Sequence, residues 1–147
     1  MEKPLSEITL RKYETPYQLG KRELAKRICL SLGLLQPGDS RDVIADILLV
    51  LMNAKKEKKY LEIEKIQEEV IKSRKEANCE EKGIAESNIR RQLRRLKDLM
   101  VVERKNNSYR ISEFSPLSLI FEEKIERFLM PSIISRIKEY LKEFEKE

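Results

Sequence analysis

The residues best suited to chemistry in this chain are four arginines that fall within six positions, from Arg90 to Arg95. The guanidinium group is planar and always charged, so it can bond to both O6 and N7 of guanine or hold a phosphate with two parallel hydrogen bonds. Four such groups so close together cannot all reach base edges, and some of them would hold phosphates instead. The cluster therefore predicts an anion-binding surface.

The arginines fall in a segment that is predicted to be an amphipathic helix. Apolar residues recur there with separations of four, three and four positions, and they are Ile89, Leu93, Leu96 and Met100. Arg91 and Arg94 fall opposite this apolar face, and the other two arginines fall on its flanks. We expect the helix to begin at Ser87, whose hydroxyl can accept a hydrogen bond from the free N–H groups of the first turn.

A short β-hairpin is predicted directly after this helix. Residues 101–104 and 109–111, VVER and YRI, are β-type runs. They are joined across Asn106-Asn107, a pair that tolerates the positive φ of a two-residue hairpin turn. Because the turn is short, we expect the hairpin to brace a sugar–phosphate backbone and not to insert deeply into a minor groove.

An arginine-rich helix followed by a basic hairpin resembles the recognition helix and wing of winged helix-turn-helix regulators, the broad group that includes the MarR-like and ArsR-like repressors. The resemblance covers Ser40 to Ser112. It implies a mainly α-helical fold with a small β-hairpin: an N-terminal extension with one helix (1–38), a winged helix-turn-helix domain (39–113) and a C-terminal helical region (114–147). The implied function is sequence-specific binding of double-stranded DNA by a transcriptional regulator.

The resemblance also implies roles for individual side chains. Arg91 and Arg94 are expected to contact bases in the major groove, and Asp98 is placed to pair with Arg94 four residues before it. Asn88 and Gln92 are candidate donors to adenine or phosphate. The full set of candidate DNA-binding residues, including those expected on the sugar–phosphate backbone, is Ser87, Asn88, Arg90, Arg91, Gln92, Arg94, Arg95, Lys97, Arg104, Lys105 and Arg110.

Two helices are predicted before the arginine-rich one. The apolar run at 43–52, capped by Asp39 or Ser40, should be the central helix of the core. A short strand at 60–62 and an acidic helix to about Lys75 follow, and the acidic helix suits the supporting element of the motif. The connection at 76–86 is longer than the three or four residues usual there. Either the acidic helix continues through it, with a stop at its glycine, or an inserted loop separates the two helices.

The N-terminal extension is predicted to contain a helix that begins near Leu19 and continues through Leu32. One side of this helix is basic, and it either contacts phosphates or is a solvated face that packs on a neighbour, which is the usual fate of charge runs. The residues of this side are Lys21, Arg22, Lys26 and Arg27. Before the helix, residues 8–13 are compatible with an edge strand or with irregular structure.

The C-terminal region, from Leu117 to about Phe144, carries apolar residues at separations of three and four. A kink or a helix restart is expected at Pro131. This is more apolar surface than a small domain can cover. We predict a two-fold homodimer through these helices, and the alternative is packing onto the chain's own N-terminal helix around Ile28.

Composition limits the class of protein. In 147 residues, 40% are hydrophobic and 39% charged, which suits a folded domain with extensions. The longest apolar run, 43–52, is about half of the ~20 residues that span a bilayer, so no membrane association is expected. Without a signal-peptide pattern, and with Cys29 and Cys79 isolated, we expect reduced thiols and a cytoplasmic location. The Lys- and Glu-rich composition is typical of thermophiles, and we expect an archaeal origin.

Catalysis is not expected. The chain has no histidine, so it lacks Ser–His and Cys–His pairs and an HExxH site, and it has no Walker loop or GxGxxG motif. We therefore expect no metal and no cofactor, and the sequence shows no evident small-molecule ligand. Two alternatives to DNA binding stay open: a winged helix that binds protein in a chromosomal or transcriptional assembly, and an RNA-binding winged helix.

Overall fold

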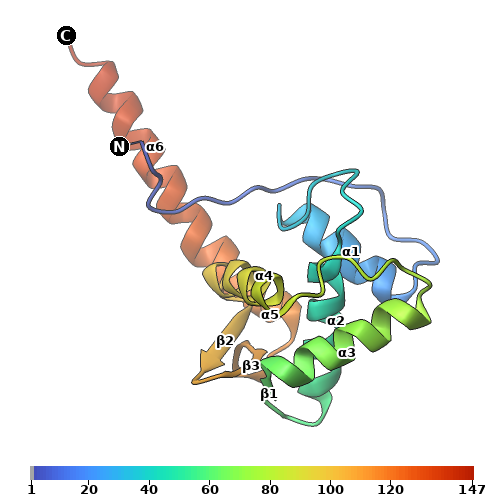
Figure 1. The fold of residues 1–147 in the computed structure, drawn as a ribbon. Coiled ribbons are helices and arrows are strands. Elements are labelled where there is room, and N and C mark those ends of the chain that lie inside the picture. Colours follow the sequence, from blue (N-terminus) through green and yellow to red (C-terminus); the bar gives the residue numbers. More distant parts are fainter. Residues whose placement is uncertain (1) are drawn as a thin grey trace.

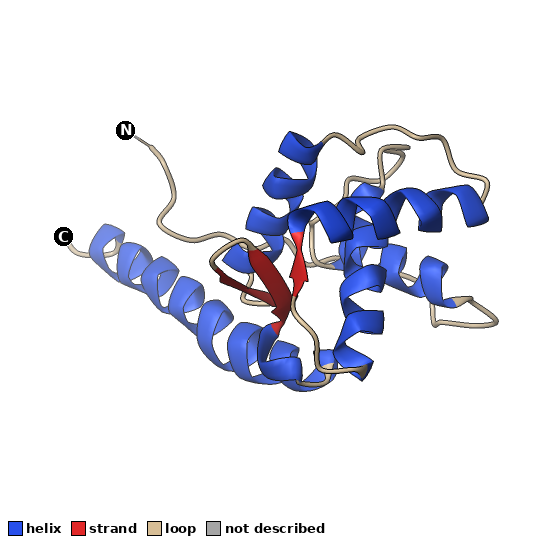
Figure 2. Ribbon diagram, turned by 60° about the horizontal axis from the view of Figure 1, so that its bottom comes forward, coloured by secondary structure: helices blue, strands red, loops and turns tan. Residues whose placement is uncertain are grey.

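The computed structural model describes residues 2–147, which form a mainly helical chain with one three-stranded antiparallel sheet (Figures 1 and 2). The elements in chain order are α1 (Lys21–Ser31), α2 (Val43–Lys56), β1 (Leu61–Glu62), α3 (Ile63–Glu76), α4 (Glu86–Asp98), β2 (Val102–Lys105), β3 (Ser108–Ile111), the 3-10 turn η1 (Ser112–Phe114), α5 (Leu117–Ile120), the π-helical segment η2 (Phe121–Leu129) and α6 (Met130–Phe144).

α2 is the central helix of the core, as its apolar run predicts. Ile47 and Leu51 are almost fully buried, and α1, α3 and α4 all pack against α2. The helices α3 and α4 each bury one face, because apolar residues recur on them at helical spacing. The residues of these two faces that have no solvent exposure are Ile63, Ile66 and Val70 of α3 and Ile89, Leu93 and Leu96 of α4.

The small sheet has the strand order β1-β3-β2 and is antiparallel throughout. Leu61 of β1 lies opposite Tyr109 of β3, and Val102 of β2 lies opposite Ile111 at the other end of β3. The hairpin turn falls at residues 106 and 107, as predicted, and Asn106 takes the positive φ of +56° that such a turn requires. The short strand expected before α3 is also present, at Leu61–Glu62.

The ends of two helices differ from the predictions. The N-cap of α4 lies two residues earlier than expected: it is Ala85, and Ser87 lies exposed in the first turn without capping the helix. α2 begins after Asp42 and not after Asp39 or Ser40. The Asp42 carboxylate caps no backbone N–H because ion pairs with two arginines occupy it.

The long connection before α4 is an inserted loop, not a continuation of the preceding helix. α3 ends at Glu76, and Asn78 adopts a φ of +55°. The backbone N–H groups of Asn78 and Cys79 donate to the carbonyl oxygens of Lys75 (3.1 Å) and Arg74 (2.8 Å), the pattern of a Schellman stop. The predicted stop at Gly83 is therefore wrong, because the helix has already ended several residues earlier.

Residues 2–20 are irregular, so the segment at 8–13 is not an edge strand. The guanidinium group of Arg11 holds it in place by donating to the carbonyl oxygens of Leu30 (2.8 Å), in the last turn of α1, and of Leu35 (3.1 Å), in the loop that follows. Residues 3–6, near the N-terminus, line a shallow pocket together with residues of α6.

The C-terminal region is one long helical rod composed of α5, η2 and α6. Pro131 lies in the first turn of α6, but helical dihedral angles continue through Leu129 and Met130, so the backbone does not break there. The two halves of the rod have different environments. Ile120 and Ile125 are buried against the rest of the chain, whereas α6 has no buried residue and extends away from the core (Figure 1).

Candidate nucleic-acid interface

The outer face of α4 presents guanidinium groups to solvent. Arg91 and Arg94 are exposed on the side opposite the buried apolar face. The Arg91 guanidinium donates only to the neighbouring side-chain oxygen of Asn88, at 2.8 Å. Within residues 2–147, neither Arg94 nor Lys97 pairs with a carboxylate, and the expected Arg94–Asp98 ion pair does not form. Helix packing therefore fixes the backbone beneath these cations while their charges stay available.

The two flanking arginines of α4 are tied to the rest of the chain. Arg90 donates to the Glu86 carboxylate at 2.8 Å, and to the side-chain oxygen of Asn107 in the hairpin turn at 3.3 Å. The hydrogen bond and charge of Glu86 raise the pKa of Arg90 above its usual value. Arg95 donates to Gln92 at 2.9 Å and to the Gly33 carbonyl oxygen at 3.3 Å. Arg90 thus links α4 to the hairpin, and Arg95 links α4 to the end of α1.

The two amide side chains expected to meet adenine or phosphate are engaged inside the protein. Asn88 donates from its amide nitrogen to the Gly83 carbonyl oxygen at 2.7 Å. Its oxygen accepts from Arg91 (2.8 Å) and from Gln92 (3.1 Å). Asn88 therefore fastens the inserted loop to the first turns of α4, and a contact with nucleic acid would require it to release these partners.

The hairpin presents its cations unequally. Arg104 and Lys105 are exposed, and Arg104 donates to the nearby carbonyl oxygen of Asn106 at 2.6 Å. Arg110 is instead enclosed, because it pairs with Glu103 at 2.7 Å and its guanidinium carbon lies 5.0 Å from the centre of the Tyr60 ring and 4.7 Å from that of Phe114. Such cation–π contacts stabilise the charge locally, so Arg110 supports the sheet.

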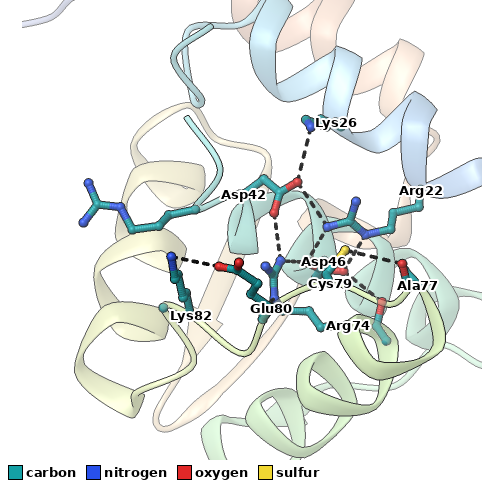
Figure 3. A network of polar contacts seen from close by, with 12 residues as sticks. Arg22, Lys26, Asp42, Asp46, Arg74, Ala77, Cys79, Glu80 and Lys82 are labelled. Atoms are coloured by element: carbon teal, nitrogen blue, oxygen red, sulfur yellow. Dashed lines mark hydrogen bonds and ion pairs between the residues drawn. The ribbon is translucent and has the colours of Figure 1, made fainter. Parts of the chain in front are cut away.

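A second cluster of charged residues, which sequence reasoning missed, lies buried between α1, α2 and α3 (Figure 3). The Arg74 side chain, with a residue exposure of 1%, reaches Asp42 and Asp46 at 2.8 Å each. Arg22 of α1 pairs with Asp46 at 3.0 Å and Asp42 at 3.2 Å. Lys26 adds a contact of 3.4 Å to Asp42, so three cations surround two carboxylates.

These pairs set the charge states of the buried cluster. Burial alone would raise the pKa of Asp42, but hydrogen bonding from Arg74 and the positive charge of Arg22 outweigh it and lower the pKa. Burial likewise works against the charge of Arg74, yet its hydrogen bonds to the two carboxylates raise its pKa overall. Within residues 2–147, every buried side-chain nitrogen or oxygen has a hydrogen-bond partner. The lowered pKa of Asp42 and the raised pKa of Arg74 keep this pair charged at neutral pH.

The buried cluster also positions the loop that leads into α4. The Nε of Arg74 donates to the carbonyl oxygen of Glu80 at 2.7 Å, so the residue that joins the aspartates also holds residues 77–85. The sequence places Arg22 on the basic side of the N-terminal helix and gives no indication of a role for Arg74. The available signal was Asp46, a carboxylate in the middle of the most apolar run of the chain, which must find a cation if it is buried.

The described part of the chain contains no group of three or more Cys, Asp or Glu residues arranged to hold a metal ion. None of its helices combines the length and the apolar character needed to cross a membrane. Comparison of the chain with known protein families, with curated proteins and with solved structures found no match.

Proposed function

We propose that this chain is a winged helix-turn-helix protein that binds double-stranded DNA in a sequence-specific manner and regulates transcription as a homodimer. In this proposal α4 enters the major groove, the β2–β3 hairpin braces the adjacent backbone, and α3 supports α4 from behind.

One observation carries the proposal: Arg91 and Arg94 are exposed on a helix whose opposite face is completely buried. A side chain can discriminate bases only when its backbone is held in a fixed place and its donors are not already used. Arg94 meets both conditions, since α4 packs on α2 and α3, and no carboxylate within residues 2–147 pairs with it.

The position of the hairpin supports the same proposal. Arg90 connects α4 to the hairpin turn through Asn107, and the exposed Arg104 and Lys105 lie near that turn. Cations on two elements that are fastened together can contact a groove and the flanking phosphates at the same time. The irregular loop between α3 and α4 departs from the short turn usual in the motif, but the Arg74 and Asn88 hydrogen bonds hold it at both ends.

The proposed homodimer forms through α6. Four large apolar side chains of this helix are about half exposed or more, and they are Ile134, Ile137, Leu141 and Phe144. A second copy of the same helix would cover them in an isologous two-fold contact. The dimer would then prefer pseudo-palindromic sites whose half-sites lie about one helical turn, ~34 Å, or a multiple of it apart.

The direct test is a band-shift assay on random-sequence duplexes at graded salt concentrations, followed by selection of preferred sites. We expect affinity to fall steeply with salt, because each neutralised phosphate contributes about −0.9 to the slope of log K against log salt. The variant Arg91→Ala/Arg94→Ala should lose about 30-fold or more in affinity for a selected site, since each base contact is worth ~1–3 kcal/mol.

The matched control is Lys21→Ala/Lys56→Ala, which removes two exposed positive charges from α1 and α2. This control variant should retain its selectivity for DNA sequence and lose only a sequence-independent electrostatic contribution to the affinity for DNA. If both double variants select the same sequences as the natural chain, α4 does not contact bases. Binding that prefers single-stranded or duplex RNA would instead favour the RNA-binding alternative.

Sedimentation tests the dimer independently of DNA. Ile137→Glu places a carboxylate on the exposed apolar face of α6 and should give a monomer that binds half-sites weakly. The control Lys138→Glu changes the neighbouring exposed position. A natural chain that sediments as a monomer at all concentrations would contradict the homodimer.

The second candidate function is a winged helix that binds an acidic protein surface in a larger assembly. Two observations favour it: Arg90 and Arg110 are already paired with the chain's own carboxylates, and α6 offers a long apolar face that a different protein could cover. A chain that is monomeric and shows no salt-dependent DNA binding would support this candidate.

A further inference from the structure

A cavity of about 500 Å³ lies between α1, the N-terminal segment and the buried half of the C-terminal rod. Its floor is formed by Leu48 of α2 and Leu96 of α4, and Phe121 and Ile125 of η2 form a wall. Ile28, a large apolar residue of α1 that remains partly exposed, also faces it. The volume lies within the range of about 300–1,000 Å³ that is typical of sites for small organic molecules.

The lining is almost entirely apolar, with one cation among the exceptions. The guanidinium carbon of Arg27 lies 5.5 Å from the centre of the Tyr13 ring, and Arg27 forms no ion pair within residues 2–147. Glu14 also reaches the lining and is exposed, but no cation of the described chain pairs with it. Arg22 and Lys26, on the same helix, are by contrast occupied by the buried aspartates. Arg27 thus combines a free charge with an apolar cavity.

We propose that this cavity binds a small organic acid with an apolar body, and that Arg27 takes its carboxylate. An apolar chain or ring would cover the leucine and isoleucine side chains of the lining. The planar fork of Arg27 would meet the carboxylate with two hydrogen bonds. The sequence predicted no such ligand, because residues from four separate parts of the chain form the cavity.

The backbone of the cavity wall supports this assignment. Residues 121–129 are π-helical, and two residues of this stretch, Phe121 and Ile125, face the cavity. π-Helical turns are rare in proteins and are frequently found at functional sites. Here the irregular turn lies beside the cavity and not in the exposed part of the rod.

Three unbranched probes of ten carbons each separate the contributions of charge and apolar surface: decanoate, 1-decanol and decylamine. Isothermal titration calorimetry below micelle-forming concentrations should show decanoate binding once per chain, more tightly than the alcohol and much more tightly than the amine. At about a hundredfold excess over its Kd, decanoate should raise the Tm by about 5–10 °C, as expected for a ligand that binds only the folded state.

Two variants locate the site. Arg27→Gln should weaken decanoate binding about tenfold, the effect of losing a charge-assisted hydrogen bond, and leave 1-decanol binding unchanged. Lys21→Gln, an identical charge change at an exposed position of the same helix, should alter neither. Ser31→Phe places a ring among the lining residues and should abolish binding of both probes.

Several results would overturn the proposal: no saturable binding of decanoate, equal affinity for decanoate and decylamine, or an Arg27→Gln variant that binds decanoate as the natural chain does. If side chains of a second copy fill the cavity, decanoate will not bind and Ser31→Phe will shift the sedimentation equilibrium, which also overturns it. If Ser31→Phe does not fold, the decanoate affinities of Arg27→Gln and Lys21→Gln still show whether Arg27 binds the carboxylate. None of these measurements involves nucleic acid.

Discussion

Arginine occurs in two opposite environments in this chain. Arg74 and Arg22 lie between three helices, where each contacts both Asp42 and Asp46. Arg91 and Arg94 stand on the exposed face of α4 without a carboxylate partner in residues 2–147. The first pair joins secondary-structure elements, and the second is available to an external anion.

The difference follows from the cost of removing a charge from water. Burying a guanidinium without a partner would cost several kcal/mol, so Arg74 can be buried only because two aspartates accept its hydrogen bonds. An exposed guanidinium needs no partner within the protein, because water solvates its charge. Its N–H groups can therefore donate hydrogen bonds to an external anion. We therefore expect the buried arginines to determine stability and the exposed ones to determine binding.

The largest effect should come from Arg74→Met, compared with Arg91→Met. Without Arg74, the buried carboxylates of Asp42 and Asp46 lose their most buried cationic partner and keep the ion pairs with Arg22 and Lys26. This loss should lower the free energy of unfolding by about 3–5 kcal/mol. The same substitution at the exposed Arg91 should change it by no more than about 0.5 kcal/mol. Urea unfolding followed by circular dichroism measures both. A loss below about 1 kcal/mol for Arg74→Met would mean that Arg22 and Lys26 satisfy the aspartates by themselves.

A smaller effect should appear on acidification. The pKa of Asp42 is lower in the folded chain than its ordinary value of about 3.9. The stabilisation is therefore fully present above about pH 4 and is lost as the pH falls through the lower, folded-state pKa. Unfolding free energies measured from pH 6 to pH 2.5 should fall more steeply for the natural chain than for Asp42→Asn. The Arg91→Met variant should retain the steep profile, and parallel profiles for all three chains would contradict this assignment.

The smallest effect concerns the inserted loop and uses its cysteine as a reporter. Cys29 has no solvent exposure and burial raises its pKa to about 12, so Cys79 should be the only thiol that reacts readily with a labelling reagent. Arg74→Lys keeps the charge but cannot reproduce all the hydrogen bonds to the aspartates and to Glu80. Loss of one such bond, ~1 kcal/mol, should speed Cys79 labelling roughly fivefold. An unchanged rate would show that the Arg74 hydrogen bond to Glu80 does not hold the loop.

Local patterns in the sequence were sufficient to predict most of the elements that form the interface. The spacing of Ile89, Leu93 and Leu96 predicted both the α4 helix and the side on which its arginines lie. The Asn106-Asn107 pair predicted the hairpin turn. These features depend on interactions between residues a few positions apart, which are visible in any single stretch of sequence.

The tertiary structure alone decided which charges are free and which are occupied. Arg22 and Arg74 are indistinguishable in sequence from surface arginines, and only the packing of α1 and α3 on α2 brings them to the aspartates. It also decided that the C-terminal rod buries Ile120 and Ile125 against the core, whereas α6 has no buried residue. The physical reason is that pairing and burial depend on neighbours distant in the chain, whereas periodicity and turn formation depend on neighbours close to it.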